Sequence, residues 1–234
     1  MREIVFDTET TGMDPFTGDR VIEIGAIELV NHLPSGKTLQ LYINPERDVP
    51  AEATAVHGIT NDFLKDKPVF SQVYSEFIEF IGSDGILVAH NAEFDMKFMN
   101  WELKKVGHAD IPNNRVIDTL KIARKKFPGS PANLDALCRR FNIDNTARTY
   151  HGALLDSELL AEVYLELLGG RQRGLSLTPE QNTNENGSVK TITTKERKFR
   201  EPRPHKASPE ELTEHKEFLG QLTDPIWEKI AKAK

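Results

Sequence analysis

The spacing of apolar residues divides the first 170 residues of the chain into strands and helices. Alternating or short continuous apolar runs predict strands at 2–6, 20–30, 38–43, 86–89 and 115–117. Apolar residues three or four apart predict helices at 70–81, 92–106, 119–126, 133–141 and 152–168. A turn at Pro34-Ser35-Gly36 is expected before the third strand. Three early strands followed by strands mixed with helices predict an α/β fold, in which helices flank a mixed β-sheet.

The pattern changes after Gly169-Gly170. Few residues between 171 and 208 are apolar, and Asn, Thr, Lys and Arg dominate, so we expect a flexible linker there. Ser208 followed by Pro209 predicts the start of a short C-terminal helix, because Ser caps helices and Pro suits their first position. The chain is therefore expected to form a domain at 1–170, a linker at 171–208 and a C-terminal segment at 209–234.

Composition and charge narrow the class of protein. The 234 residues are 38% hydrophobic and 28% charged, and no apolar run is long enough to cross a bilayer. A single cysteine, Cys138, excludes an internal disulfide; we expect a buried thiol in a helix and a cytoplasmic protein. Residues 1–170 carry 17 Lys and Arg against 26 Asp and Glu, a net charge of −9. Such a domain does not bind duplex DNA by bulk electrostatics, but its acids could hold metal ions.

The first candidate site is the pair Asp7 and Glu9, which directly follows the apolar run Ile4-Val5-Phe6. Side chains two residues apart on a strand point to the same face, so the two carboxylates would lie side by side. A hard divalent cation would turn their repulsion into attraction. The D-x-E pattern is common, and when it stands alone a solvated turn at a strand end explains it better than a metal site does.

Two further groups of polar residues stand where regular elements begin. Asp95 lies in HNAEFD, where the strand at 86–89 gives way to a helix. Asp156 lies early in the helix of HGALLDSELLAEVY, and His151 precedes that helix on a loop, with a side chain suited to a general base. Taken singly, Asp95 is better explained as a helix cap or first-turn acid, and a surface histidine in a cap explains His151 equally well. Asp118 is interpreted only as a helix cap.

Together these residues make the set that a two-metal phosphodiesterase needs, in which one ion activates a water and the other stabilises the leaving oxygen. The stretches FDTETTG, HNAEFD and HGALLDSELLAEVY resemble the three motifs of the DEDDh superfamily of 3′–5′ exonucleases, and the spacing H-x4-D is that of its His branch. The resemblance implies a ribonuclease-H-like exonuclease domain. It also implies two bound Mg²⁺ or Mn²⁺ ions held by Asp7, Glu9 and Asp156, Asp95 completing the acidic set, and His151 as the general base.

A closer resemblance covers residues 2–170. VHGI, FPGSPANLDALC and DNTARTYHGALLD are similar to segments of the epsilon family of proofreading subunits of bacterial DNA polymerase III; Ser130-Pro131-Ala132 departs from the family pattern, away from the motifs. The resemblance implies removal of misincorporated nucleotides from single-stranded or frayed DNA 3′ ends. It implies that Glu52 and His57 join the metal ligands in binding the substrate, although a helix-forming acid and a packed loop histidine remain alternatives.

The resemblance also implies partners for the tail. Gln172, Leu175 and Leu177 match the short peptides that dock on the bacterial sliding clamp, although such a pattern often arises by chance. Phe218, Leu222 and Trp227 are candidate anchors for the catalytic (alpha) subunit of the polymerase, because buried aromatic residues tend to dominate interfaces. A small theta-like stabilising subunit is a further expected partner, and a cytoplasmic replisome associated with the nucleoid is the expected location.

Two alternatives remain open at this point. One is a related DEDDh nuclease that acts on RNA or on repair intermediates, against which the 64-residue tail argues. The other is an adaptor that has lost catalysis and only bridges polymerase and clamp. The complete set of acids with His151 argues against the adaptor, because a purely structural protein has no need of a repulsive acidic cluster.

Overall fold

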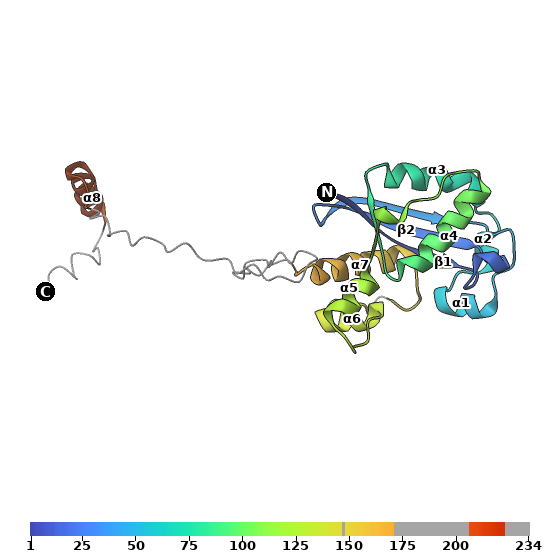
Figure 1. Cartoon of the computed structure of the whole chain (residues 1–234). Coiled ribbons are helices and arrows are strands. Elements are labelled where there is room, and N and C mark those ends of the chain that lie inside the picture. The colour runs from blue at the N-terminus through green and yellow to red at the C-terminus, as the bar shows by residue number, and fades with distance from the viewer. Residues whose placement is uncertain (147, 171–205, 223–234) are drawn as a thin grey trace, which may run out of the picture. The chain divides into compact units, whose positions relative to one another are not determined.

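The computed structural model describes residues 1–146, 148–170 and 206–222 (Figure 1). The chain falls into two units, within residues 1–177 and 178–234, and each is described by itself.

The first unit is built on one five-stranded sheet with the strand order β3-β2-β1-β4-β5. Its strands are β1 (Arg2–Thr10), β2 (Val21–Val30), β3 (Leu33–Tyr42), β4 (Ile86–Ala89) and β5 (Val116–Asp118). The first three strands pair antiparallel, whereas β4 lies parallel to β1 and β5 parallel to β4. The predicted mixed sheet is therefore confirmed, with β1 at its centre.

Helices lie on both sides of this sheet (Figure 1). They are α1 (Ala51–His57), α2 (Asn61–Leu64), α3 (Phe70–Ile81), α4 (Ala92–Lys105), α5 (Thr119–Lys126), α6 (Leu134–Phe141) and α7 (Ala153–Leu167), with short 3-10 turns at Pro15–Thr17 and Asn113–Arg115. The five predicted helices of this unit are confirmed to within one residue at either end. The sequence did not predict α1 and α2, because seven and four residues are too few to show a helical period.

The alternation of side chains along β1 assigns its two faces. Ile4 and Phe6 pack in the core that contains Phe77 of α3 and Phe98 of α4. Val5 packs on the opposite face, in the cluster that includes Leu160 and Tyr164 of α7. Because the period of a strand is two residues, positions 7 and 9 continue the face that α7 covers, and position 8 continues the face that α4 covers.

Two predictions about the strands are wrong. The strand that starts at Arg2 does not end at Phe6 but continues through both acids to Thr10. The third strand starts at Leu33, and the turn before it lies at Asn31 and His32, which both have positive φ, of 53° and 66°. A two-residue hairpin turn with positive φ at both positions matches the twist of paired strands. Pro34 is tolerated inside the strand because β3 is an edge strand.

Three smaller predictions are confirmed. Asp118 caps α5 by accepting a hydrogen bond from the backbone N–H of Leu120. Cys138 is buried in α6. In the second unit, Ser208 caps α8 (Pro209–Gln221) and exchanges hydrogen bonds with Glu211 three residues later. Among the described helices, none combines the length and the apolar character needed to cross a membrane.

Candidate active site

The end of β1 places two carboxylates on the face of the sheet that α7 covers. Asp7 pairs with Gly25 of β2, and Glu9 pairs with Glu23. Directly after Glu9 the register shifts, so that Thr10 lies opposite Val21. Irregularities of this kind bend a strand and redirect its side chains, and they are frequent next to active sites. The acids therefore lie on the last regular part of the central strand.

Helix α7 is fastened against β2 by contacts that require a glycine. A Cβ atom added to Gly25 would lie 2.2 Å from the backbone carbonyl carbon of Ala153, so only glycine allows this approach. The Ser157 hydroxyl donates to the Gly25 carbonyl oxygen at 3.0 Å. Glu23 accepts a hydrogen bond from the Ala153 backbone N–H, the first of the helix. These contacts bring Asp156, in the first turn of α7, to the acids of β1.

Asp95 reaches the same end of β1 from α4. Its Oδ1 accepts hydrogen bonds from the Thr8 hydroxyl at 2.7 Å and from the Thr8 backbone N–H at 3.1 Å. The turn before α4 depends on Asn91, which adopts a left-handed conformation with φ 67° and donates its N–H to Asp118. Asp95 is almost completely buried, and its hydrogen bonds with Thr8 fix its position against β1.

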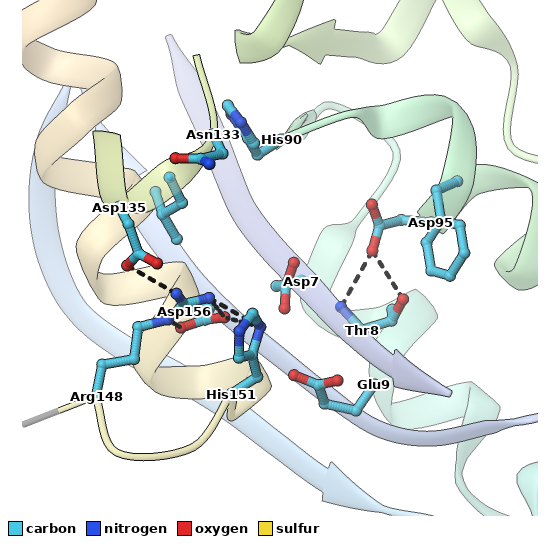
Figure 2. A pocket seen from close by; sticks show the side chains of 12 residues that line it. Asp7, Thr8, Glu9, His90, Asp95, Asn133, Asp135, Arg148, His151 and Asp156 are labelled. Atoms are coloured by element: carbon cyan, nitrogen blue, oxygen red, sulfur yellow. Dashed lines mark hydrogen bonds and ion pairs between the residues drawn. The ribbon is translucent and has the colours of Figure 1, made fainter. Parts of the chain in front are cut away.

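One pocket of about 330 Å³ collects these side chains (Figure 2). All five residues predicted to be catalytic line it, namely Asp7, Glu9, Asp95, His151 and Asp156. They come from β1, from α4 and from the start of α7 and the loop before it. Residues from elements that lie between 56 and 149 positions apart in the chain thus meet at one end of the sheet, as the prediction requires.

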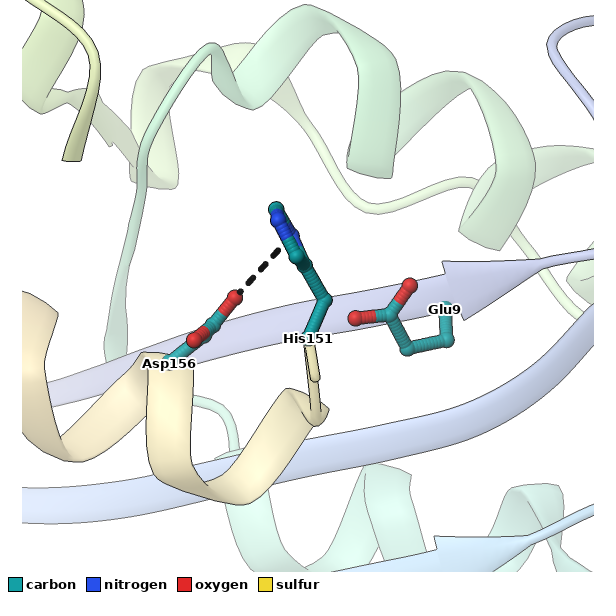
Figure 3. Close-up of side chains that lie close together, drawn as sticks. All are labelled: Glu9, His151 and Asp156. Atoms are coloured by element: carbon teal, nitrogen blue, oxygen red, sulfur yellow. Dashed lines mark ion pairs between the residues drawn. The ribbon is translucent and has the colours of Figure 1, made fainter. Parts of the chain in front are cut away.

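His151 stands at the rim of this pocket, with about half of its side chain exposed. Its backbone N–H donates to the Val56 carbonyl oxygen of α1 at 3.1 Å, which anchors the loop before α7. Its Nδ1 lies 3.6 Å from Oδ2 of Asp156. Within the described residues, Glu9, His151 and Asp156 form a group whose ligand atoms all lie within 4.8 Å of one another (Figure 3). Asp7 lines the same pocket without belonging to that group.

Arg148 fills part of the pocket and was not predicted as a site residue. Its Nε and one terminal nitrogen each lie 2.6 Å from a different oxygen of Asp156, and its other terminal nitrogen bonds Asp135 at 2.8 Å. The nitrogen that bonds Asp156 also lies 2.9 Å from Nδ1 of His151 (Figure 2). Within the described residues, this buried guanidinium is therefore a cationic partner of Asp156 and Asp135.

The electrostatics of the pocket favour a further positive charge. Burial raises the pKa of Glu9 to about 8, with contributions from Asp156, Glu23 and Asp95, and burial raises the pKa of Asp95 to about 7. Burial and the nearby acids, Asp95 first among them, also raise the pKa of Asp7 well above its usual value. Carboxyl groups that resist ionisation in this way become good ligands once a hard cation compensates their charge. The donor set fits Mg²⁺ or Mn²⁺.

A second pocket, of about 520 Å³, adjoins the first. Glu52 and His57 line it, and it shares Thr8, Glu9 and Phe94 with the acidic pocket. The Nδ1 of His57 accepts the backbone N–H of Ile59, so the ring proton is on Nε2. That Nε2 is buried and has no hydrogen-bond partner among the described residues. A donor that lines a pocket without a partner is suited to a polar ligand.

Comparisons with known proteins agree with this geometry. Residues 4–164 match the family model described as "RNase_T: Exonuclease". The DNA polymerase III subunit epsilon of Rickettsia conorii is 50% identical over 226 residues, 95% of this chain and 96% of that protein. The same subunit of Escherichia coli K12 is 44% identical over 227 residues, 93% of this chain and 92% of that protein. The chain belongs to this exonuclease family, among the epsilon subunits of DNA polymerase III.

Solved structures show the same fold. The nuclease domain of 3'hExo, a DEDDh family member bound to rAMP, superimposes with a TM-score of 0.61 at 23% identity, covering 71% of this chain and 91% of that one. Exonuclease X in complex with 5′ overhanging duplex DNA gives a TM-score of 0.56 at 25% identity, covering 70% of this chain and 90% of that one. The predicted ribonuclease-H-like exonuclease fold is confirmed.

The function predicted for the chain is confirmed at the level of the family. Like the epsilon subunits, it is a 3′–5′ DNA exonuclease that proofreads for DNA polymerase III. Within the described residues, the group of Glu9, His151 and Asp156 is one that could hold a metal ion.

The residues predicted to bind partners are described only in part. Gln172, Leu175, Leu177 and Trp227 lie outside the described residues. Phe218 lies in α8 with 57% of its surface exposed, and Leu222 follows that helix with 38% exposed. The two described candidates are thus accessible to a partner, and their role remains a prediction.

Four residues with a part in the site were missed from the sequence, namely Thr8, Glu23, Asp135 and Arg148. Arg148 was visible inside DNTARTYHGALLD, three positions before His151. An arginine beside an expected metal ligand is a signal for an ion pair, but the sequence does not say which acid it reaches. Thr8 and Glu23 act through partners 87 and 130 residues away, which no local pattern shows.

Proposed function

We propose that Asp7, Glu9 and Asp156 hold two divalent ions, Mg²⁺ or Mn²⁺, and that the chain uses them to hydrolyse the last phosphodiester bond of a DNA 3′ end. One observation carries this proposal: a single pocket gathers the four acids and His151 from three separate elements. Bound ions would activate a water and stabilise the leaving oxygen. The raised pKa values of Asp7 and Glu9 support it, because burial and the neighbouring acids disfavour their ionised forms and a bound cation would favour them.

His151 is the general base of the proposal. Its exposed ring at the mouth of the pocket lies beside Asp156 and Glu9, where a water bound to the acids' ions would lie within reach. The hydrogen bond from its backbone to Val56 holds the loop in place. An imidazole in such a position can accept the proton of the attacking water and pass it to solvent.

The second pocket is proposed to bind the terminal nucleotide. It shares Glu9 with the acidic pocket, so a nucleotide there has its phosphate next to the acids. The free Nε2–H of His57 and the carboxylate of Glu52 offer a donor and an acceptor to a sugar hydroxyl or a base. Only an unpaired end can enter such a pocket, because pairing and stacking must first be broken. Frayed or mismatched ends are therefore the expected substrate.

The tail is proposed to place this activity within the replicase. The relatives named above are subunits of DNA polymerase III, and 92% or more of their length aligns with this chain. We assign the clamp contact to Gln172, Leu175 and Leu177, and the contact with the polymerase alpha subunit to Phe218, Leu222 and Trp227. Such a tether raises the local concentration of the nuclease at the primer end without adding contacts to DNA.

The test is digestion of a 5′-labelled single-stranded DNA with Mg²⁺, with Mn²⁺ and with EDTA. We expect a ladder that shortens from the 3′ end only when metal is present, and faster removal of a mismatched than of a paired primer end. Asp7→Asn should lower the rate by about a hundred- to a thousandfold, the scale of the loss of one electrostatic stabiliser of the transition state. Glu76→Gln, an exposed carboxylate of α3, is the matched control and should leave the rate unchanged.

The outcome against the proposal is equally clear. Folded wild-type protein that degrades no DNA with either metal would contradict it and would favour the adaptor. Circular dichroism of Asp7→Asn must match that of the wild type, because a folding defect would remove activity for another reason.

A further inference from the structure

We propose that Arg148 is an internal counter-cation, which occupies the acidic pocket in the metal-free protein and must release Asp156 and His151 before the pocket takes its ions. This inference rests on the proposed metal function. It concerns a residue of the chain itself, and its tests measure metal affinity and stability as well as activity.

The geometry of the Arg148–Asp156 pair is the first reason. Nε and a terminal nitrogen of the guanidinium each lie 2.6 Å from a different oxygen of Asp156. This two-fold pairing of an arginine with a carboxylate is among the strongest polar contacts in proteins. It also engages both carboxylate oxygens, and the side chains of Arg148 and Asp156 are 8% and 4% exposed. A metal ion would therefore compete with a bound guanidinium for Asp156.

The contact with His151 is the second reason. The terminal nitrogen that bonds Asp156 lies 2.9 Å from Nδ1 of His151. A guanidinium can only donate hydrogen bonds, so Nδ1 of His151 must be the acceptor. In this arrangement the lone pair of Nδ1 is engaged and cannot take the proton of a water. The Arg148 side chain thus occupies two groups at once, namely the proposed metal ligand Asp156 and one ring nitrogen of the proposed general base His151 (Figure 2).

Asp135 supplies the third reason, because it offers Arg148 a place to go. Its Oδ1 accepts a hydrogen bond from the other terminal nitrogen of Arg148 at 2.8 Å. Asp135 lies in the first turn of α6, at the edge of the pocket, and its side chain is 42% exposed. An arginine that releases Asp156 keeps this partner and gains solvent on its free side. The displaced state is therefore not an unpaired buried charge, which would be prohibitive.

A comparison within the chain separates this pair from a purely structural one. Arg20 binds Glu102 by the same two-fold contact, at 2.6 and 3.0 Å, with exposures of 15% and 1%. That pair lies away from the acidic pocket and touches none of its lining residues among the contacts described. Arg20→Gln is therefore a matched control, since it breaks a buried arginine–carboxylate pair of the same geometry without freeing a metal ligand.

The decisive experiment measures Mn²⁺ binding by isothermal titration calorimetry, using the full chain and its Arg148→Gln and Arg20→Gln variants. We expect Arg148→Gln to bind Mn²⁺ about tenfold more tightly than the wild type, because a competing cation is gone. Its melting temperature in EDTA should fall, and saturating Mn²⁺ should raise that temperature more than in the wild type. Arg20→Gln should also melt earlier in EDTA, with unchanged affinity for Mn²⁺.

A second measurement observes the exchange directly. In ¹⁵N-labelled protein, the Nε–H signal of Arg148, identified by its absence in Arg148→Lys, should shift on addition of diamagnetic Mg²⁺. The same signal should stay in place when Mg²⁺ is added to Asp156→Asn, in which the contested carboxylate is missing. This readout is independent of the melting temperature of any variant.

Each contrary result has a separate meaning. Equal or weaker Mn²⁺ binding by Arg148→Gln would overturn the inference and make Arg148 a structural support of the ligands. Absence of Mn²⁺ and Mg²⁺ binding in the wild type would overturn the metal proposal and this inference together. A wild type that binds Mn²⁺ and digests DNA, with an Arg148 signal unmoved by Mg²⁺, would overturn only the inference.

Discussion

The acidic residues of the pocket repel one another in the folded chain, and a bound cation would relieve that repulsion. Glu9 is about nine-tenths buried, near Asp156 and Glu23, and its pKa is raised to about 8 from an ordinary value of 4.5. Between these two values the folded protein holds a proton on Glu9 that the unfolded chain has lost. Stability therefore falls as pH rises through this window, since the folded state binds more protons.

This sign gives a prediction for the metal-free protein. Its melting temperature in EDTA should decrease between pH 5 and pH 8. Glu9→Gln should show a shallower decrease, because the carboxyl group whose pKa is raised is no longer present. Part of the slope should remain, owing to Asp95, whose pKa is raised to about 7. Differential scanning calorimetry at three pH values measures this change of melting temperature with pH. The control Glu76→Gln should keep the wild-type slope, and an unchanged slope in Glu9→Gln would contradict the assignment.

The residues of the site were predictable to the extent that their chemistry is local in sequence. Asp7 and Glu9 share a strand face, and the H-x4-D spacing keeps His151 and Asp156 together, so their types and spacing were enough. Arg148 was not assigned, because its importance depends on which acid it reaches in three dimensions. Thr8 was missed for the same reason, since a threonine beside two acids has no distinctive pattern until α4 brings Asp95 to it.

At the level of elements, the close contact between β2 and α7 determines where the third acid lies. Gly25 lets the first turn of α7 touch the sheet, and Glu23 and Ser157 hold it there by hydrogen bonds to backbone groups. This contact between β2 and α7 determines the position of Asp156. The site thus depends on residues that never reach the substrate.

Gly25→Ala tests this dependence. The added Cβ would lie 2.2 Å from backbone atoms of Ala153 and Leu154, so α7 must move away from the sheet. We expect a loss of about 1–3 kcal/mol in the free energy of unfolding, as for overpacked cores. The exonuclease rate should fall by at least about tenfold in protein that remains folded, because catalytic groups tolerate little displacement. Urea unfolding and the labelled-DNA assay measure both effects.

The control for this variant is Gly220→Ala in α8, where the added Cβ meets nothing within 4 Å. It should retain the wild-type exonuclease rate. If Gly25→Ala were as active as Gly220→Ala, the close contact would not determine the position of Asp156.

The prediction of helices and strands succeeded where apolar residues repeat over several turns. It failed where a turn sets the boundary of a strand. Helices such as α3 and α7 show several apolar repeats and were located to within one residue. The hairpin between β2 and β3 was misplaced because Pro34 and Gly36 suggest a turn, whereas Asn31 and His32 adopt it. Pro and Gly cost an edge strand little stability, so in such a strand they are weaker signals for a turn than usual.

At the level of the whole molecule, the chain combines an acidic nuclease unit with a tail in whose described part Leu212, Phe218 and Leu222 are exposed. Residues 1–170 carry a net charge of −9, so this unit has little electrostatic attraction for DNA. Leu212, Phe218 and Leu222, in or just after α8, are exposed, and none of the residues of that helix is buried among the described parts of the chain. A partner that covers these side chains would supply the DNA end that the acidic unit does not attract by itself.

Catalysis and tethering should therefore be separable by mutation. Phe218→Ser combined with Leu222→Ser should weaken binding to the polymerase alpha subunit by at least about tenfold, because exposed apolar anchors tend to dominate such interfaces. The same variant should digest free single-stranded DNA at the wild-type rate. Asp7→Asn should behave in the opposite way, with intact polymerase binding and no digestion. Surface plasmon resonance and the labelled-DNA assay measure the two properties independently.

The clamp contact gives the last separation. Gln172→Ala combined with Leu175→Ala should lower affinity for the sliding clamp while leaving both polymerase binding and digestion of free DNA unchanged, because these residues are assigned to the clamp alone. Unchanged clamp affinity would remove that assignment.

On a primed template with polymerase and clamp present, each tail variant should proofread mismatches more slowly than its activity on free DNA predicts, since a tether acts only through local concentration. Equal proofreading rates with and without the tail contacts would mean that the nuclease unit finds the primer end by itself.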